Sequence, residues 1–142
     1  MSHQTDLLII GAGPSGLFAA YYAGFRGLSV AVVDSLPELG GQISALYPEK
    51  AILDVAGHPN IAGRALVANL VEQAATASPT YFLERTATEL DIGDESVAVG
   101  LDDGTQIVAK CVIITAGIGK FTPRALPAGE GACCSGGLGR VQ

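Results

Sequence analysis

Residues 6–34 read DLLIIGAGPSGLFAAYYAGFRGLSVAVVD, and the fold class can be inferred from this segment. The apolar run at 7–10 predicts a strand, which is followed by the turn GAGPSG at 11–16 and by a helix expected from Ser15 to Arg26. In such a G-x-G-x-x-G turn, the first glycine allows the tight bend, the second lets a diphosphate approach the backbone, and the third lets the helix pack on the strand. Free N–H groups at the start of the helix favour an anion. The residues predicted to hold the diphosphate of a dinucleotide are Gly11, Gly13, Ser15 and Gly16.

Asp34 ends the next predicted strand, 29–33, and lies 18 positions after Gly16. A carboxylate in this position accepts hydrogen bonds from ribose hydroxyls, and it repels a 2′-phosphate unless an arginine is close. Residues 35–40 contain no Arg or Lys. The site therefore suits the adenosine half of FAD or NAD and argues against NADP as its ligand.

The same region has a second interpretation, because 7–25 contains 19 residues without a charge. A run of this length could cross a membrane or serve as a signal sequence. Glycines and a proline interrupt the run, however, and no basic segment precedes it. We therefore expect a cytoplasmic protein that does not enter a membrane.

The composition indicates one globular domain. The chain has 142 residues, 49% of them apolar, and its eight basic and fourteen acidic residues give a net charge of −6. This charge disfavours nucleic acid and anionic membranes as partners. The cysteines at 111, 133 and 134 lack C-x-x-C spacing, so neither a disulfide scaffold nor a metal site is expected. Cys111 and the aromatic side chains of the first helix are expected in the core.

Strands and helices alternate along the chain, which predicts a parallel sheet. A helix is expected at 62–77 and a strand at 80–83, after a long irregular connection at 36–58. Between 87 and 110 the pattern changes to short β segments, with Asp103 and Gly104 in a hairpin that joins 97–101 to 106–109. A buried strand at 111–115 should return to the central sheet and end at Gly117, where a cofactor could approach the backbone. The predicted fold class is α/β, a Rossmann-like domain with a parallel sheet and a small antiparallel β excursion.

Four motifs together resemble those of the two-dinucleotide-binding flavoprotein reductases: GAGPSG at 11–16, Asp34, GGQ at 40–42 and IITAG at 113–117. More narrowly, GQISALYPEK at 41–50 and DVAGHP at 54–59 resemble the bacterial thioredoxin-reductase-like ferredoxin–NADP reductases. Thioredoxin reductases share the glycine turn and GGQ, but the LYPEK segment is more similar to that of the ferredoxin reductases. The resemblance extends over residues 6–124.

This resemblance implies a flavoprotein oxidoreductase that binds FAD and passes electrons between NADPH and ferredoxin, or a similar small electron carrier, as a homodimer. It places Asp34 on the FAD ribose, Gln42 and Tyr47 near the flavin, the Ala87 backbone at the adenine and Phe121 close to the isoalloxazine. Tyr47 offers a flat face for stacking, although a tyrosine in such a loop is by itself more often a half-buried anchor. Because the flavin carries the chemistry, no catalytic side chain or catalytic metal is expected.

The resemblance fades after Arg124. Residues 125–142 contain five glycines and no periodic apolar face, so an irregular tail is expected there. The NADPH-binding domain of the family does not fit in this tail, which favours a truncated or frame-altered product that is not competent alone. Three interpretations stay open: the FAD-binding part of a ferredoxin–NADP-type or thioredoxin-type reductase, a small complete NAD-binding enzyme, and a non-catalytic fragment of the fold.

Overall fold

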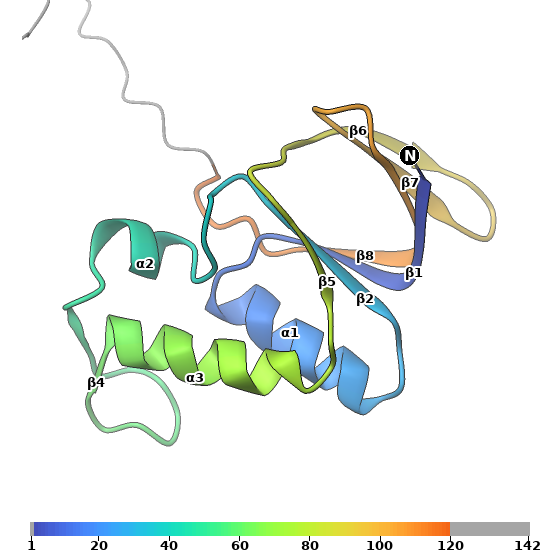
Figure 1. Cartoon of the computed structure of the whole chain (residues 1–142). Helices are drawn as coiled ribbons and strands as arrows, with labels where there is room; N and C mark the ends of the chain where they lie inside the picture. Colours follow the sequence, from blue (N-terminus) through green and yellow to red (C-terminus); the bar gives the residue numbers. More distant parts are fainter. Residues whose placement is uncertain (1, 120–142) are drawn as a thin grey trace, which may run out of the picture.

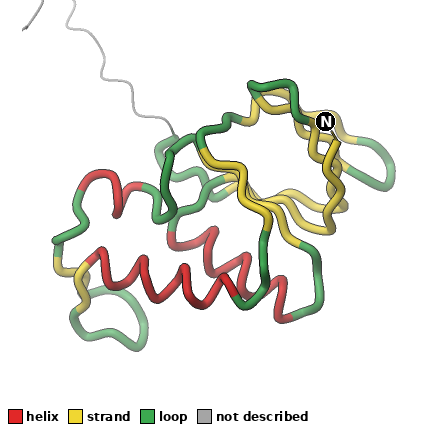
Figure 2. Tube along the Cα trace, viewed as in Figure 1, coloured by secondary structure: helices red, strands yellow, loops and turns green. Residues whose placement is uncertain are grey.

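The computed structural model describes residues 2–119, which form a six-stranded sheet in the order β5-β2-β1-β8-β7-β6 together with a small two-stranded sheet of β3 and β4 (Figures 1 and 2). The strands are β1 Ser2–Ile10, β2 Val30–Asp34, β3 Ala51–Ile52, β4 Ile61–Ala62, β5 Thr80–Leu83, β6 Ala87–Ile92, β7 Val97–Leu101 and β8 Gln106–Ile114. The helices are α1 Pro14–Phe25, α2 Gln42–Leu46 and α3 Gly63–Ala75.

The central strands β5, β2, β1 and β8 are parallel neighbours, as the sequence predicts. Leu8 of β1 lies between Ala31 of β2 and Val112 of β8 in the register. Because parallel strands run in one direction, their carboxyl ends meet at the same edge of the sheet. The glycine turn, Asp34 and the residues after β5 and β8 are thereby brought to this edge.

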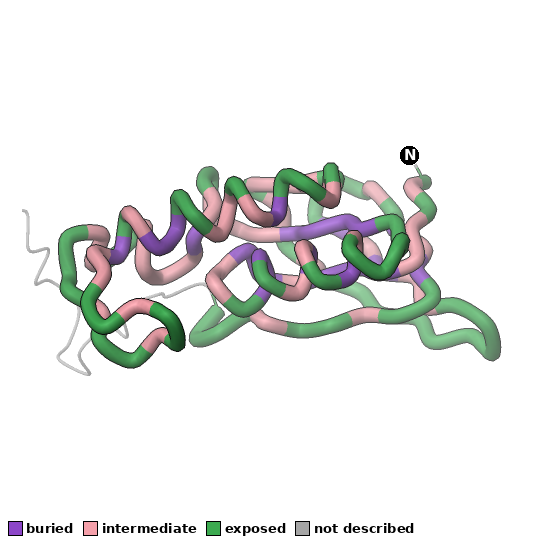
Figure 3. The backbone as a smooth tube through the Cα atoms, turned by 90° about the horizontal axis from the view of Figure 1, so that it is seen from below, coloured by how far each residue is buried: buried purple, intermediate pink, exposed green. Residues whose placement is uncertain are grey.

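The long helices α1 and α3 lie side by side on one face of the parallel strands (Figure 1). The core beneath them joins Leu7, Ile9 and Val32 of the strands to Leu17 and other small apolar residues of the helices. The buried positions follow the central strands and the inner sides of the two helices (Figure 3). Alternate residues of β1 and β2 therefore pack against the helices.

The alternate strand residues form a second core on the opposite face. Leu8, Ala31 and Val33 pack there against Val99, Leu101, Ile107 and Ala109 of the antiparallel strands. The sheet therefore bends so that β6 and β7 fold over its own parallel half (Figure 1). The antiparallel excursion is confirmed, with Gly104 at φ +82° in the hairpin between β7 and β8.

The structure corrects three details of the sequence analysis. The segments 106–109 and 111–115 form one continuous strand, β8, in place of two. Cys111 is exposed and not buried, because β7 covers only the first half of β8 and α1 lies over β1 and β2. Most aromatic side chains of α1 also point away from the core, since Phe18 is 50%, Tyr22 53% and Phe25 71% exposed.

None of the helices within residues 2–119 combines the length and the apolar character needed to span a lipid bilayer.

Candidate functional site

The glycine turn connects β1 to α1, and its three glycines meet different surroundings. Gly11 has φ +110°, and a Cβ there would lie 2.5 Å from the Thr115 carbonyl oxygen. A Cβ on Gly16 would collide with the Gly11 carbonyl oxygen. A Cβ on Gly13, by contrast, would have no atom within 4 Å. Gly11 and Gly16 are therefore required by packing, whereas Gly13 keeps open the space in front of the start of α1.

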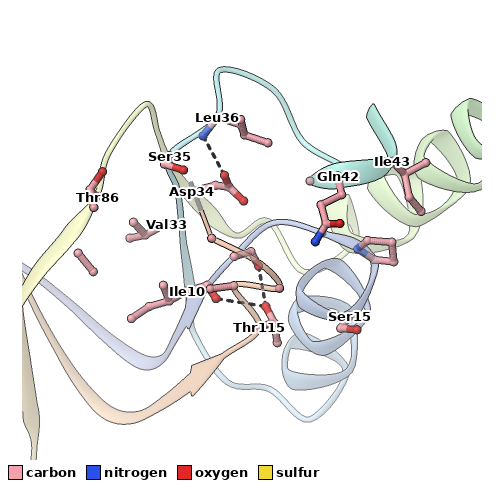
Figure 4. Close-up of a pocket in the computed structure, with 18 of the residues that line it drawn as sticks. Ile10, Ser15, Val33, Asp34, Ser35, Leu36, Gln42, Ile43, Thr86 and Thr115 are labelled. Carbon is pink, nitrogen blue, oxygen red and sulfur yellow. Dashed lines mark hydrogen bonds between the residues drawn. The ribbon is translucent and has the colours of Figure 1, made fainter. Parts of the chain in front are cut away.

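Thr115 fixes the end of β8 to this turn. Its N–H donates to the Ile10 carbonyl at 2.7 Å, and its hydroxyl donates to the Gly11 carbonyl at 2.8 Å (Figure 4). Two residues that are 105 positions apart in the chain thereby join the carboxyl ends of β1 and β8. Thr115 was quoted in the sequence motif but not singled out as a site residue, because its hydroxyl gives no signal until β1 and β8 are paired.

Asp34 lies at the end of β2 and connects two backbone segments. One carboxylate oxygen accepts a hydrogen bond from the Ala12 N–H at 2.6 Å, and the other accepts from the Leu36 N–H at 2.8 Å. The carboxylate is half-buried and lines the cavity. Because each oxygen can accept more than one hydrogen bond, Asp34 retains acceptor capacity toward a ligand.

The loop before α2 closes the other side of the glycine turn. The Gly40 N–H donates to the Ala12 carbonyl at 2.9 Å, and Gly41, at φ +60°, approaches so closely that a Cβ would lie 3.0 Å from the Gly13 Cα. This contact directs Gln42 across to the end of β8, where a Cβ on Gly117 would lie 2.8 Å from its Nε2. The segment 40–42 therefore forms one wall of the site.

Tyr47 follows α2 and lines the same cavity. The Nζ of Lys50 lies over its ring, 5.3 Å from the centroid, an arrangement that favours a cation–π interaction. The tyrosine is half-buried. Its placement is therefore compatible with both sequence interpretations, a loop anchor and a stacking surface.

Arg85, Thr86 and Ala87 form the opposite end of the cavity. The Arg85 N–H donates to the Asp34 carbonyl at 3.0 Å, and the Thr86 carbonyl accepts from the Asp102 N–H at 3.0 Å. Figure 4 shows Thr86 at one end, Gln42 and Ile43 at the other, and Asp34 between them. Arg85 was not predicted as part of the site, because only the pairing of β2 with β5 brings its backbone beside Asp34.

These segments enclose a cavity of about 470 Å³, within the range of small-molecule and cofactor sites. The structure brings together on its wall eight of the predicted site residues: Gly11, Gly13, Ser15, Asp34, Gln42, Tyr47, Ala87 and Gly117. Gly16 lies behind the wall, where α1 packs on the turn. Phe121 lies outside the described residues.

The comparison with protein families gives one match over most of the chain. Residues 5–137 match the family described as pyridine nucleotide-disulphide oxidoreductase. Among curated proteins, a ferredoxin–NADP reductase from Nocardioides sp. is 71% identical over 132 residues, which cover 90% of this chain and 40% of the relative. A ferredoxin–NADP reductase from Salinispora tropica is 60% identical over 128 residues, again 40% of its length. The chain thus spans about 40% of the length of these relatives.

A solved structure shares the same architecture. Thioredoxin reductase from Streptococcus pyogenes superposes with a TM-score of 0.68 at 29% identity, over 78% of this chain and 34% of that protein. The Rossmann-like fold predicted from the sequence is therefore confirmed by both the strand order and the structural match.

Proposed function

Because the chain belongs to the pyridine nucleotide-disulphide oxidoreductase family, we propose that residues 6–124 are the FAD-binding portion of a ferredoxin–NADP reductase. The names of the relatives support the reductase class, since those that are 71% and 60% identical are both called ferredoxin–NADP reductase. The structural match to thioredoxin reductase, at 29% identity, is more distant. Ferredoxin is accordingly the preferred electron carrier in this proposal, and thioredoxin-type reduction is the alternative.

The observation that carries the proposal is the order of groups along one cavity wall. The open face of Gly13 and the start of α1 suit a diphosphate, because unpaired N–H groups and the helix dipole favour negative charge there. Asp34 lies next along the wall and would accept hydrogen bonds from the ribose hydroxyls. The Ala87 backbone, at the far end, would meet the adenine. The order of these three positions along the wall matches the order of diphosphate, ribose and base in an ADP moiety.

The opposite end of the cavity would receive the flavin. Gln42 and Gly117 approach each other there, and Tyr47 stands beside them. The Gln42 amide can donate and accept hydrogen bonds at the ring edge, and the Tyr47 ring can stack. Phe121 is proposed as a further neighbour of the isoalloxazine. When bound, the flavin supplies hydride and single-electron transfer, and the residues named here bind it, orient it and exclude water.

NADPH, ferredoxin and a second subunit are proposed as partners of the longer reductase that these relatives represent, and the cytoplasm is its proposed location. The chain itself spans about 40% of the length of the relatives, so the test concerns the FAD site alone. Neither nucleic acid nor membrane is proposed as a partner, on the basis of the net charge of −6.

The proposal is tested by purifying the 142-residue chain, adding FAD, removing the excess by desalting and recording the visible absorption spectrum. We expect a yellow protein that retains FAD, and weaker retention of FMN because FMN lacks the adenosine half. A colourless protein that instead binds NAD tightly would overturn the FAD assignment and support the small NAD-binding enzyme.

A further inference from the structure

Arg85 lies at one end of the cavity, next to Asp34. β5 pairs with β2 so that Leu83 is opposite Asp34, and the chain then turns across the sheet edge. The Arg85 N–H donates to the Asp34 carbonyl at 3.0 Å, and the residue lines the cavity. Arg85 therefore belongs, with Thr86 and Ala87, to the end of the cavity that lies away from Gln42.

The guanidinium of Arg85 is held in one orientation by two acceptors. Its Nε donates to an Asp103 carboxylate oxygen at 2.7 Å, and its Nη1 donates to the Glu84 carbonyl at 2.8 Å. Asp103 is itself fixed in the β7–β8 hairpin, because its other oxygen accepts from the Thr105 N–H at 2.8 Å. The hydrogen bonds from Thr105, and then the one from Arg85, lower the pKa of Asp103 to about 2, so this partner is ionised at neutral pH.

Ligand geometry places a base beside this group. In an adenosine diphosphate moiety the diphosphate is attached to C5′ of the ribose, and the base is attached to C1′. If the diphosphate is at Gly13 and the ribose hydroxyls are at Asp34, the base extends toward Arg85, Thr86 and Ala87. Figure 4 shows the required sequence of positions, with Thr86 beyond Asp34 as seen from Gln42.

We propose that Arg85, oriented by Asp103, recognises the adenine of the ligand by presenting its planar guanidinium for the base to stack on. This inference rests on the proposed FAD site. Guanidinium planes stack on nucleobases and aromatic faces, and an arginine whose orientation is already fixed loses little freedom on binding. The carboxylate of Asp103 offsets the charge of Arg85, and Asp34 adds a negative charge nearby. Arg85 therefore contacts the base and does not hold a phosphate.

The experiment compares ligands that carry adenine with one that carries uracil, and it compares the wild-type chain with four variants. Kd values for FAD, ADP and UDP are measured by titration calorimetry on the wild-type chain and on R85A, R85K, D103N and D102N. We expect R85A to weaken the binding of FAD and ADP about 10-fold, because the base loses the surface on which it stacks, and to weaken the binding of UDP less. R85K keeps the charge but lacks the plane, so it should lose most of the same affinity.

The Asp103 variant and its neighbour separate orientation from charge. D103N should weaken ADP binding several-fold because the guanidinium is no longer held. D102N removes the same charge from the adjacent exposed residue, whose side chain makes no hydrogen bond within residues 2–119, and it should bind ADP like the wild type. Thermal unfolding of each variant verifies that it folds. If R85A does not fold, R85K, which keeps the stem and the cation for Asp103, supplies the readout.

Three results would overturn the inference while leaving the FAD site intact: wild-type affinity for ADP in R85A, wild-type affinity in R85K, or an equal loss for ADP and UDP in R85A. The last result would mean that Arg85 contacts the phosphates. A wild-type chain that binds neither FAD nor ADP would overturn the proposed function and this inference together.

Discussion

At the scale of single residues, Asp34 has one observed structural role and one proposed binding role, and a substitution must separate them. Its carboxylate accepts from the Ala12 N–H and the Leu36 N–H, so it holds the glycine turn in place before any ligand is present. The proposed ribose hydroxyls would use its remaining acceptor capacity. Replacement by alanine removes both roles at once, and an asparagine is the more informative change.

We predict that Asp34→Asn weakens FAD binding about 10-fold or more, because hydrogen bonds to a charged acceptor contribute about 1.5–3 kcal/mol. One side-chain oxygen remains to accept from the backbone, so the fold should persist with a loss of about 1 kcal/mol in the free energy of unfolding. Fluorescence titration with FAD and urea denaturation measure the two effects. Glu38→Gln, an exposed carboxylate in the following loop, is the matched control. Unchanged FAD affinity in Asp34→Asn would remove Asp34 from the site.

The glycine turn and Asp34 could be predicted because their signal is local, with each glycine and the acid at a fixed distance along one strand–helix–strand unit. Arg85 and Thr115 could not, because their positions depend on pairing between distant strands. Arg85 reaches Asp34 through the β2–β5 register, and Thr115 reaches Ile10 through the β1–β8 register. Sequence spacing does not report such contacts.

At the scale of elements, the unit β1–turn–α1 gives a prediction that separates folding from binding. Gly16→Ala places a methyl group against the Gly11 carbonyl and should lower the free energy of unfolding by more than about 2 kcal/mol. Gly13→Ala meets open space at φ −72°, so it should fold with unchanged or slightly higher stability. It should nevertheless bind FAD far more weakly, because the methyl group would occupy the proposed diphosphate position. Urea denaturation and FAD titration of both variants test this. Normal FAD binding by Gly13→Ala would place the diphosphate elsewhere.

β8 shows why one element was predicted as two strands. Lys110 interrupts the apolar pattern between 106–109 and 111–115, and a charged residue in that position is typical of a break. In the structure Lys110 continues the strand, and its Nζ forms an ion pair with an Asp6 carboxylate oxygen at 2.7 Å. The charge is thus accommodated by a partner on β1 that only the three-dimensional arrangement supplies.

Asp6 also connects β1 to the start of β2, since its second oxygen accepts from the Ser29 N–H at 2.9 Å and from the Ser29 hydroxyl at 2.7 Å. The hydrogen bond from Lys110 and then those from Ser29 hold the pKa of Asp6 well below its usual range. Because the pKa of Asp6 is lower in the folded state than in the unfolded state, its ionised carboxylate stabilises the fold at pH values above the unfolded-state pKa of about 3.9. This stabilisation is lost as the pH falls toward the folded-state pKa.

We therefore predict that Asp6→Asn makes the free energy of unfolding less dependent on pH below about pH 5, because the asparagine does not titrate. Urea denaturation at a series of pH values from neutral to acid measures the slope. Asp94→Asn, in the exposed turn between β6 and β7, is the control. An acid slope in Asp6→Asn as steep as that of the wild type would show that other carboxylates govern it.

At the scale of the whole molecule, the fold class could be predicted from the sequence, but which apolar side chains are exposed could not. α1 presents Phe18, Tyr22 and Phe25 on its outer side, at helical spacing. Cys111 and Ile113 of β8 face the same side of the sheet as Leu7 and Ile9, their neighbours in the register. Within residues 2–119, no strand pairs with the outer edge of β8 from Cys111 to Ile114. These side chains were predicted to be core because their apolar pattern does not reveal which neighbours cover them.

The exposed aromatic row of α1, Phe18, Tyr22 and Phe25, gives the last prediction, because clustered exposed apolar side chains bind hydrophobic dyes and lower solubility. We expect the wild-type chain to enhance the fluorescence of anilinonaphthalene sulfonate, and Tyr22→Lys, in the middle of the aromatic row, to reduce that enhancement and raise the precipitation threshold. The free energy of unfolding should change by less than about 1 kcal/mol, since the side chain is 53% exposed. Leu53→Lys, at 68% exposure in the loop after β3, is the control and should leave dye binding nearly unchanged. Equal effects of the two substitutions would mean that total apolar exposure, and not the aromatic row of α1, determines dye binding.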